Sequence, residues 1–359
     1  MRSMRICLDG QGHTGRLTGG GKALVFLLRQ LRHDFPQHEY TVLSAPGRGQ
    51  WRLPRQLFWE QVQFPWWAFR LQANLLHAPA GMSGPLLRHR RLVMTVHDIA
   101  PTRHPEFLPN VRSRWYWGRW IPLTARFADC VLVPSASTKR DLVELVRIPE
   151  ARIRVIPLGV PLDPLGAADP GAVEKVRDKY RLPARYILYV GTIDRRKDYP
   201  TLLRAIHELD VGRHLVVAGS VIAGRTNFPQ MVEQLGLKDR VRILGYVPDE
   251  DLSGLFRGAA AFVYPSFYEG FGLPVLEAMA LGTPVITYHT TSLPEVVGEA
   301  GILLRPPVSP KALAAEITRV IEDETLRCEL VGRGFEQAKR FDWRTTARLT
   351  LGVYEALAS

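Results

Sequence analysis

The sequence has few of the features that indicate disulfide-rich, metal-binding, membrane-spanning or secreted proteins. Its 359 residues contain three cysteines, Cys7, Cys130 and Cys328, which lie far apart in apolar or helical surroundings and predict neither a disulfide framework nor a metal site. No apolar run of about eighteen residues occurs, and residues 1–5 lead directly into a strand-like segment instead of a secretory signal. We therefore expect a globular protein located in the cytoplasm.

Positive charge is unevenly distributed along the chain. Residues 1–165 contain 23 Lys and Arg against 11 Asp and Glu, whereas residues 166–359 contain 24 of each. Seven of the eight tryptophans also lie in the first half. A basic domain with exposed tryptophans favours contact with an anionic membrane surface, although buried tryptophans and a charge that serves solubility would give the same counts. We expect the first half to contact the inner face of the plasma membrane peripherally.

The most informative stretch runs from Tyr264 to Ile286. Residues 259–264 predict a buried strand, 265–272 a loop, and Pro274 the first residue of a short helix. Glu277 would then lie in the first turn and point back toward Glu269 in the loop. Two carboxylates would repel a phosphate, but each can accept hydrogen bonds from two neighbouring hydroxyls of a sugar or ribose. The alternative is that Glu277 only favours the helix dipole and Glu269 is solvated.

Glu269 and Glu277, with seven residues between them, resemble the Glu-x7-Glu signature of retaining GT-B glycosyltransferases, the group called glycosyltransferase family 4. The resemblance extends from Ser266 to Ile286 without gaps. It implies that Glu269 contacts the donor sugar and that Glu277 binds the ribose hydroxyls. The loop backbone would contact sugar and phosphate at Gly270, Phe271, Gly272 and Leu273.

A glycine-rich segment follows the first predicted strand, residues 5–9. Residues 10–15 match the G-x-G-x-x-G spacing, but the predicted helix, Ala23 to Leu31, begins only after Gly21, and no acid ends the next strand. The match alone is weak, and there is no Walker A motif. By resemblance to the family, the loop that includes Gly20 and Gly21 would face the donor diphosphate and the acceptor.

The segment from Arg48 to Arg70 contains a mixture of basic and aromatic residues. Such a segment could bind nucleic acid by stacking, which leaves a basic nucleic-acid-binding protein as an alternative. No nucleic-acid motif accompanies it, so we predict no nucleic-acid partner and favour a partly exposed helix that contacts lipid or acceptor. Residues 59–61, Trp-Glu-Gln, resemble a family element at this place.

His97 follows a buried-strand run, residues 91–96, and so lies at the carboxyl end of a strand, where open α/β sheets bind ligands. A lone histidine is usually structural. Here the His-Asp segment resembles the one that lies beside the donor sugar in the family, so we assign His97 to the site.

Two further segments complete the predicted donor site. Residues 191–198 follow a strand and carry adjacent cations suited to a pyrophosphate; by resemblance, Gly191, Arg196 and Lys197 face the diphosphate. The backbone of Tyr246 and Val247 would face the nucleotide base. Asp249 and Asp251 match a metal-binding Asp-x-Asp pattern, but we interpret Asp249 as a helix N-cap and predict no metal and no cofactor.

Proline and glycine residues, which interrupt helices and strands, cluster at 157–166. After this segment the sequence again predicts alternating strands and helices. We expect an α/β protein with two Rossmann-like, doubly wound parallel sheets that face a cleft, which is the GT-B fold. The predicted parts are an acceptor-binding domain at 1–163, a nucleotide-sugar-binding domain at 164–341, and a helix at 342–359 that packs back on the first domain.

The resemblance implies metal-independent transfer of a hexose from a nucleotide diphosphate sugar to a hydroxyl of a glycan or lipid-linked acceptor, with retained configuration. The residues of the His-Asp segment and of the glutamate loop resemble those of mannosyltransferases most, which favours GDP-mannose as the donor. UDP- and ADP-sugars are the alternatives. A nucleotide-sugar epimerase is the alternative within the fold, and the basic loop together with the Glu pair disfavours it. The predicted catalytic residues are His97, Glu269, Arg196 and Lys197.

Overall fold

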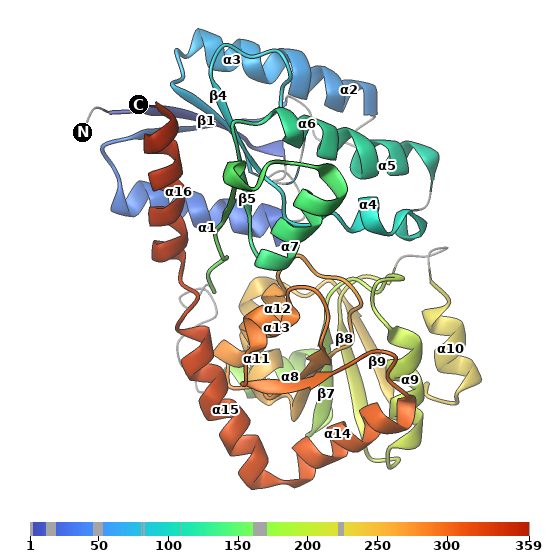
Figure 1. Cartoon of the computed structure of the whole chain (residues 1–359). Coiled ribbons are helices and arrows are strands. Elements are labelled where there is room, and N and C mark those ends of the chain that lie inside the picture. Colours follow the sequence, from blue (N-terminus) through green and yellow to red (C-terminus); the bar gives the residue numbers. More distant parts are fainter. Residues whose placement is uncertain are drawn as a thin grey trace. The chain divides into compact units, whose positions relative to one another are not determined.

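The computed structural model describes residues 3–11, 19–45, 53–79, 81, 83–108, 110–160, 171–221 and 226–358. The chain divides into two compact units. Unit 1 comprises Met1–Gly159 with Phe341–Ser359, and unit 2 comprises Val160–Arg340. Each unit holds one parallel six-stranded sheet with helices on its faces (Figure 1). The expected α/β class with two doubly wound sheets is confirmed.

The sheet of unit 1 has the order β2-β1-β3-β4-β5-β6, and every pairing is parallel. The four central strands, β1, β3, β4 and β5, are short and mostly buried, as expected when both faces of a sheet are covered, whereas the edge strands β2 and β6 are only partly buried. The strands of this sheet are β1 (Arg5–Asp9), β2 (Glu39–Leu43), β3 (Leu75–Ala78), β4 (Arg91–Thr95), β5 (Cys130–Val133) and β6 (Ile153–Val155).

Alternate residues of these strands face two helical layers, because side chains of a strand point to opposite faces in turn. Cys7, Leu76 and Met94 pack with Trp59 and other residues of one layer. That layer contains α2 (Leu53–Phe58), the π-helix η2 (Trp59–Gln63), α3 (Phe64–Arg70), α5 (Val111–Trp115), the π-helix η4 (Tyr116–Trp120) and α6 (Ile121–Phe127).

The other layer joins the two ends of the chain. Helix α1 (Gly19–Asp34) packs against α16 (Trp343–Ala358), and α16 also contacts β3 and β4. Figure 1 shows the blue α1 and the red α16 beside the same sheet. Among the described residues, unit 1 also contains α4 (Ala100–Arg103), the 3₁₀-helix η3 (Pro105–Phe107), α7 (Ala136–Asp141), the π-helix η5 (Leu142–Val146) and the 3₁₀-helix η6 (Glu150–Arg152).

The sheet of unit 2 has the order β12-β11-β10-β7-β8-β9. Its strands are β7 (Tyr186–Val190), β8 (His214–Ala218), β9 (Val241–Gly245), β10 (Ala261–Tyr264), β11 (Val285–Tyr288) and β12 (Gly301–Leu304). From β7 the chain adds strands outward on one side, then returns to β10 and adds strands outward on the other. The strand order therefore reverses between β7 and β10, and this is the point where such sheets bind ligands, at the carboxyl ends.

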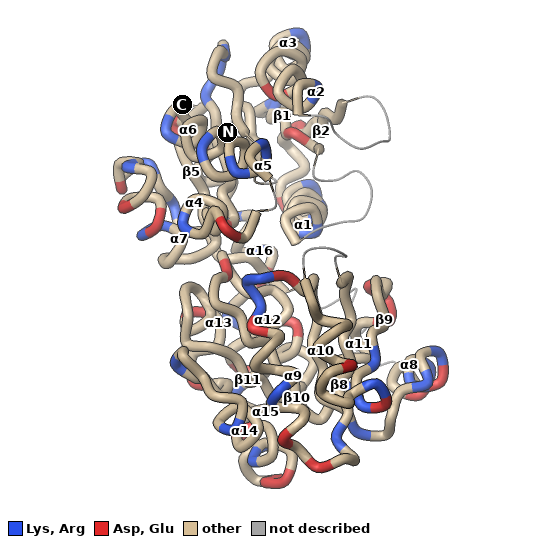
Figure 2. The backbone as a smooth tube through the Cα atoms, turned by 90° about the vertical axis from the view of Figure 1, so that its right-hand side faces the viewer, with Lys and Arg blue, Asp and Glu red and all other residues tan. Residues whose placement is uncertain are grey.

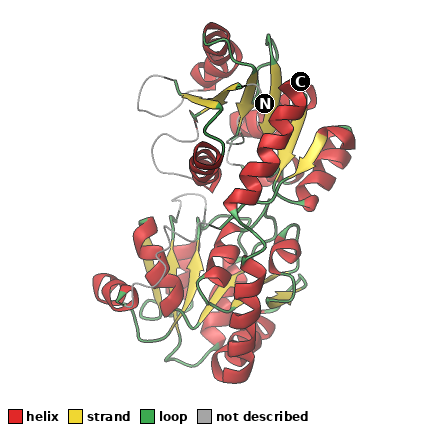
Figure 3. Ribbon diagram, turned by 90° about the vertical axis from the view of Figure 1, so that its left-hand side faces the viewer, coloured by secondary structure: helices red, strands yellow, loops and turns green. Residues whose placement is uncertain are grey.

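Helices lie on both sides of the strands of unit 2 (Figure 3). Helix α9 (Tyr199–Glu208) contacts α10 (Phe228–Gln234) and α14 (Pro310–Glu322). Helix α11 (Asp249–Gly258) contacts α8 (Ala172–Tyr180) and α12 (Leu273–Ala280), which in turn contacts α13 (Leu293–Val297) and α15 (Glu324–Ala338). Among the described helices of both units, none combines the length and apolarity needed to cross a bilayer.

Candidate functional site

Two loops meet at the point of unit 2 where the strand order reverses. Residues 191–198 follow β7 and residues 265–272 follow β10, and the two strands are neighbours in the sheet. Their backbones are joined by Asp198 N–H to the Pro265 carbonyl at 2.7 Å and by Phe267 N–H to the Arg196 carbonyl at 2.9 Å. The basic loop, residues 191–198, and the glutamate loop, residues 265–272, are therefore joined directly by backbone hydrogen bonds.

Lys197 lies at the centre of this junction and is nearly buried, with 4% of its side chain exposed. Its ammonium group donates to Glu269 Oε1 and, at 2.5 Å, to the hydroxyl of Tyr264. Burial lowers the pKa of Lys197, and Arg196 acts in the same direction, while Glu269 opposes both. Binding of the diphosphate by Lys197 stays a prediction. The structure shows a further contact of Lys197, because its ammonium group donates a hydrogen bond to the Glu269 carboxylate.

Glu269 is fixed from several sides. Ser266 Oγ donates to its Oε1 at 2.6 Å, and its backbone N–H donates to Thr291 Oγ1 at 2.9 Å. Burial would raise the pKa of Glu269, but the charges of Lys197 and Arg196 outweigh it, so the pKa is lowered overall. The group is therefore an ionised acceptor of hydrogen bonds at neutral pH, as binding of a sugar hydroxyl requires.

Arg196 is oriented within its own loop. Its backbone N–H donates to Asp194 Oδ1 at 2.8 Å, and its Nε and Nη2 both lie 3.3 Å from Asp194 Oδ2. About a quarter of the Arg196 side chain is exposed. A guanidinium that is held by one carboxylate and still reaches solvent can bind a further anion.

Helix α12 begins one residue earlier than the sequence predicted. Gly272 is its N-cap, with φ of 108°, and Leu273 is its first residue, so Pro274 is the second. Glu277 consequently lies in the second turn, and its prediction as a first-turn acid is wrong. It is buried, with 7% exposed. The φ of Gly272 lies in the region that only glycine adopts readily.

The other predicted donor residues of unit 2 follow the carboxyl ends of β7, β9 and β10. Gly191 directly follows β7, and its N–H donates to the Ala218 carbonyl at 2.9 Å. Tyr246 and Val247 directly follow β9; Tyr246 is half exposed, and Val247 is buried. Gly270 and Phe271 are buried in the loop before α12. The donor-binding roles of these residues stay predictions.

The Asp-x-Asp segment has a different structure from the one predicted. Pro248 is the N-cap of α11 and Asp249 is its first residue, so the N-cap interpretation of Asp249 is wrong by one position. Asp251 accepts hydrogen bonds from Lys179 and from the Tyr180 hydroxyl, each at 2.6 Å. Its carboxylate therefore joins α11 to α8. In the described part of the chain, no group of three or more His, Cys, Asp or Glu is arranged to hold a metal ion.

The predicted residues of unit 1 lie in two places, His97 at the carboxyl end of a strand and the glycines in a helix. His97 follows β4, and its Nε2 lies 3.1 Å from the Pro79 carbonyl, which follows β3. Burial lowers the pKa of His97 despite the opposing effects of Asp98 and Pro79, so the ring is neutral at pH 7. Gly20 and Gly21 belong to the first turn of α1 and not to the loop, because α1 begins at Gly19. Residues 12–18 of the predicted glycine loop lie outside the described residues.

Sequence reasoning assigned no role to four hydroxyl-bearing residues that build the site. The Tyr264 hydroxyl and Ser266 contact Lys197 and Glu269, as described above. Thr291 Oγ1 accepts a hydrogen bond from the Glu269 N–H at 2.9 Å. Ser292 Oγ donates to the carbonyls of Glu269 and Phe271, each at 2.9 Å. The run Thr290-Thr291-Ser292 directly after a strand-like segment was a signal that could have indicated them.

Comparisons with known proteins agree with this geometry. A family model described as Glycosyl transferases group 1 matches residues 173–337, and one described as Glycosyltransferase Family 4 matches residues 19–164. O-antigen chain mannosyltransferase B of Escherichia coli is 37% identical over 279 residues, which cover 76% of this chain and 72% of the relative. The serotype-specific mannosyltransferase WbdA of Escherichia coli is 29% identical over 276 residues, but these cover only 34% of that protein and 74% of this chain.

Solved structures agree at the level of the fold. A sucrose-phosphate synthase from Thermosynechococcus elongatus superposes with a TM-score of 0.80 at 23% identity, over 99% of each chain. Together with the two matching family models and the mannosyltransferase relative, this shows that the chain belongs to glycosyltransferase family 4 and has the GT-B fold.

Proposed function

We propose that this glycosyltransferase moves a hexose, with mannose favoured, from a nucleotide diphosphate sugar to a hydroxyl of a glycan or lipid-linked acceptor. The observation that carries the proposal is the contact of Lys197 with Glu269 where the strand order of unit 2 reverses. The names of the two mannosyltransferase relatives favour mannose. Glucose or another hexose from a UDP- or ADP-sugar is the alternative.

In this proposal the donor's charge and its sugar are bound by adjacent groups. Arg196 and Lys197 neutralise the diphosphate, assisted by the amides of residues 270–273 and the positive end of α12. Glu269 accepts hydrogen bonds from donor-sugar hydroxyls, and Glu277 accepts them from the ribose. The backbone of Gly191, Tyr246 and Val247 lies against the diphosphate and the base, so that the nucleotide spans the carboxyl ends of β7, β9 and β10.

The proposed reaction retains the anomeric configuration. The bond from the anomeric carbon to the diphosphate oxygen breaks as the acceptor hydroxyl approaches from the same face, through an oxocarbenium-like state. The leaving phosphate oxygen takes the acceptor proton, and its developing charge is stabilised by Arg196 and Lys197. Glu269 orients the sugar and forms no covalent bond. Neutral His97 lies beside the donor sugar, and Gly20 and Gly21 face the diphosphate and acceptor.

We also propose that unit 1 contacts an anionic membrane at the inner face of the plasma membrane. Four apolar side chains on the continuous helix α2-η2-α3 follow one another at helical spacing and are about half exposed, namely Phe58, Val62, Trp66 and Phe69. Aromatic residues of this kind favour the interface between lipid and water. Basic residues on α2, α3, α5 and α6 (Figure 2) add electrostatic attraction.

The test of sugar transfer is a donor panel. We would incubate the protein with GDP-, UDP-, ADP- and dTDP-sugars and measure nucleotide release, with Glu277→Ala alongside and Glu208→Ala as a control, because Glu208 is an exposed glutamate of α9. We expect release from one donor, lost in Glu277→Ala and kept in Glu208→Ala. The anomeric proton coupling of the product would show retention or inversion. Absence of both release and donor binding by calorimetry would contradict the proposal.

A further inference from the structure

Two adjoining basic pockets lie on unit 1 at the amino ends of its strands. The first has a volume of about 530 Å³ and is lined by residues that directly precede or begin β3, β4 and β5, together with the end of α16. The second has a volume of about 650 Å³ and is lined by residues near the start of β1 and the end of α3. Asn74, His89 and Arg90 line both pockets.

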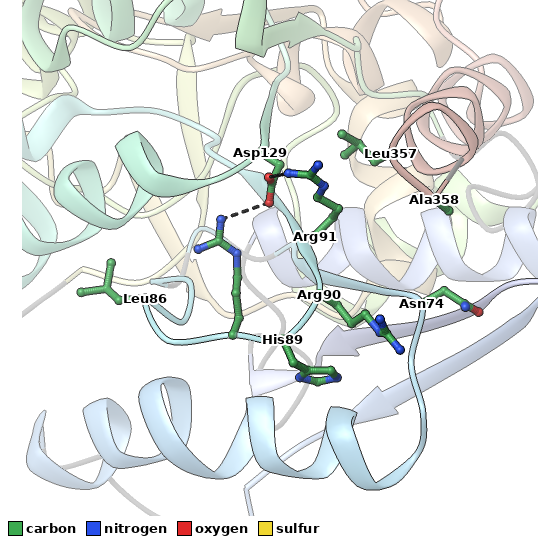
Figure 4. A pocket seen from close by; sticks show the side chains of 9 residues that line it. Asn74, Leu86, His89, Arg90, Arg91, Asp129, Leu357 and Ala358 are labelled. Atoms are coloured by element: carbon green, nitrogen blue, oxygen red, sulfur yellow. Dashed lines mark hydrogen bonds and ion pairs between the residues drawn. The ribbon is translucent and has the colours of Figure 1, made fainter.

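The first pocket has an excess of positive charge that its own residues do not neutralise. Asp129 is its one acidic residue in the described part of the chain, and it pairs with Arg88 at 3.0 Å and with Arg91 at 2.7 Å (Figure 4). Arg90 forms no ion pair among the described residues; its Nε donates to the Ala73 carbonyl at 3.1 Å. Within the described residues this is the one hydrogen bond that the Arg90 guanidinium makes; it orients the side chain and leaves Nη1 and Nη2 available for an anion.

The second pocket combines arginines with aromatic rings. Arg5 Nη1 donates to the Leu71 carbonyl at 3.2 Å and to Gln72 Oε1 at 3.1 Å, and its Nε lies 3.9 Å from Glu39. The guanidinium of Arg70 lies 5.8 Å from the centre of the Trp66 ring. Phe69, which lines the pocket, packs edge-on against His89 with ring centres 5.1 Å apart.

These pockets are separate from the ligand-binding edge of unit 1. All strands of this sheet are parallel, so their amino ends lie on one edge and their carboxyl ends on the opposite edge. His97 follows the carboxyl end of β4, whereas Arg90 precedes its amino end. Sugar transfer therefore leaves the charge of this second edge unexplained.

We propose that the two pockets bind phosphate groups, with Arg90 as the residue common to both. Guanidinium groups present paired N–H donors that match phosphate oxygens bidentately. The exposed Trp66 and Phe69 beside the second pocket favour the headgroup phosphate of an anionic phospholipid as the source, because they would enter the apolar side of the same interface. This choice of source rests on the membrane contact proposed above; the phosphate chemistry of the pockets does not.

The first experiment measures binding to vesicles by co-sedimentation. We would compare phosphatidylcholine vesicles with vesicles that also contain phosphatidylglycerol, using wild type, Arg90→Gln and Arg29→Gln. Arg29 is an exposed arginine of α1 that lines neither pocket, so its variant has the same loss of charge. We expect Arg90→Gln to weaken binding to the anionic vesicles about five-fold or more and Arg29→Gln to change it much less. Arg90→Lys should restore only part of the binding, because it keeps the charge without the paired donors.

A second arm identifies the source of the phosphate. Inorganic phosphate would be compared with chloride at equal ionic strength, and its binding followed by the shift in melting temperature. Stabilisation of wild type but not of Arg90→Gln, without vesicle binding, would support the pockets and assign them to a soluble phosphate compound. Equal effects of Arg90→Gln and Arg29→Gln, or no binding in either arm, would overturn the proposal. Donor turnover should be unchanged in Arg90→Gln, so failure here is distinguishable from failure of the sugar-transfer proposal.

Discussion

His77 and Tyr354 join the central sheet of unit 1 to the last helix of the chain. His77 Nδ1 lies 2.6 Å from the Tyr354 hydroxyl, and His77 Nε2 lies 2.8 Å from Thr95 Oγ1. The histidine is fully buried, and burial, with a smaller effect of His97, lowers its pKa to about 3. A neutral imidazole is therefore part of the folded structure over the whole physiological pH range.

The first prediction is that His77 makes the protein sensitive to acid. Unfolded His77 takes up a proton below its ordinary pKa of about 6.5, whereas folded His77 does not until about pH 3. Between these two pH values the unfolded state thus binds more protons than the folded state. The contribution of His77 to the free energy of unfolding is therefore fully present above about pH 6.5 and falls as the pH decreases. We expect wild type to lose about 2 kcal/mol relative to His77→Gln between about pH 7 and pH 5, measured by urea unfolding. His289→Gln, whose histidine is exposed, should follow the wild-type curve.

The second prediction concerns Glu60 and has the opposite sign. Its carboxyl group is fully buried and accepts from Tyr116 at 2.5 Å and from Gln56 at 3.1 Å. Burial raises the pKa of Glu60 to about 7, and nearby Asp9 contributes. The folded state therefore binds the Glu60 proton more tightly than the unfolded state does. The contribution of Glu60 to the free energy of unfolding is lost as the pH rises from about 4.5 through 7.

The corresponding measurement compares Glu60→Gln with wild type between pH 5 and pH 8. We expect wild type to lose about 2 kcal/mol relative to the variant over this range. Glu144→Gln serves as the control, because Glu144 is exposed on η5. Parallel stability curves for wild type and Glu60→Gln would contradict the prediction.

The third prediction concerns the start of α12. Gly272→Ala should destabilise unit 2 by about 1–2 kcal/mol, because a φ of 108° is strained for any residue with a Cβ. Gly332→Ala should instead stabilise by about 0.5–1 kcal/mol, since Gly332 is an exposed residue of α15 with open space around its Cβ position. Thermal unfolding of both variants tests the pair, and a stabilised Gly272→Ala would show that the helix starts differently.

The fourth prediction separates positioning from stability at the donor site. Ser266→Ala removes the 2.6 Å hydrogen bond to Glu269 Oε1, so the carboxylate loses one of its restraints. We expect kcat to fall about ten-fold, as loss of one such bond implies, with a smaller change in KM for the donor. Ser253→Ala, which removes another buried hydroxyl of unit 2, should leave kcat unchanged. An equal fall in both variants would indicate a general structural effect.

Much of the fold followed from local sequence patterns. Strands β7 and β8 are each a continuous run of mainly apolar residues that ends at a glycine, and such a pattern predicts a strand. Strand β3 was missed: it has four residues, one of them His77, and so gives almost no periodic signal. Its place between β1 and β4 is determined by pairing with distant segments.

The candidate site was predictable only in part. The Glu-x7-Glu spacing indicated Glu269 and Glu277, and the adjacent cations indicated Arg196 and Lys197. That Lys197 donates to Glu269 could not be read from the sequence, since the two residues lie 72 positions apart and meet only because β7 and β10 are neighbours. The helix starts at Leu273 and at Gly19 also differ from the predicted ones, because a pattern of apolar residues locates the end of a helix only to within a few residues.

The discontinuity of unit 1 has a consequence for synthesis on the ribosome. Its last strand, β6, ends at Val155, but α16 begins at Trp343, after the whole of unit 2 has been made. Until then His77 lacks its tyrosine partner and the face of the sheet covered by α16 stays bare. Unit 2 is one continuous segment and needs no residue from outside 160–340, whereas unit 1, although begun first, is complete only after α16 has been made.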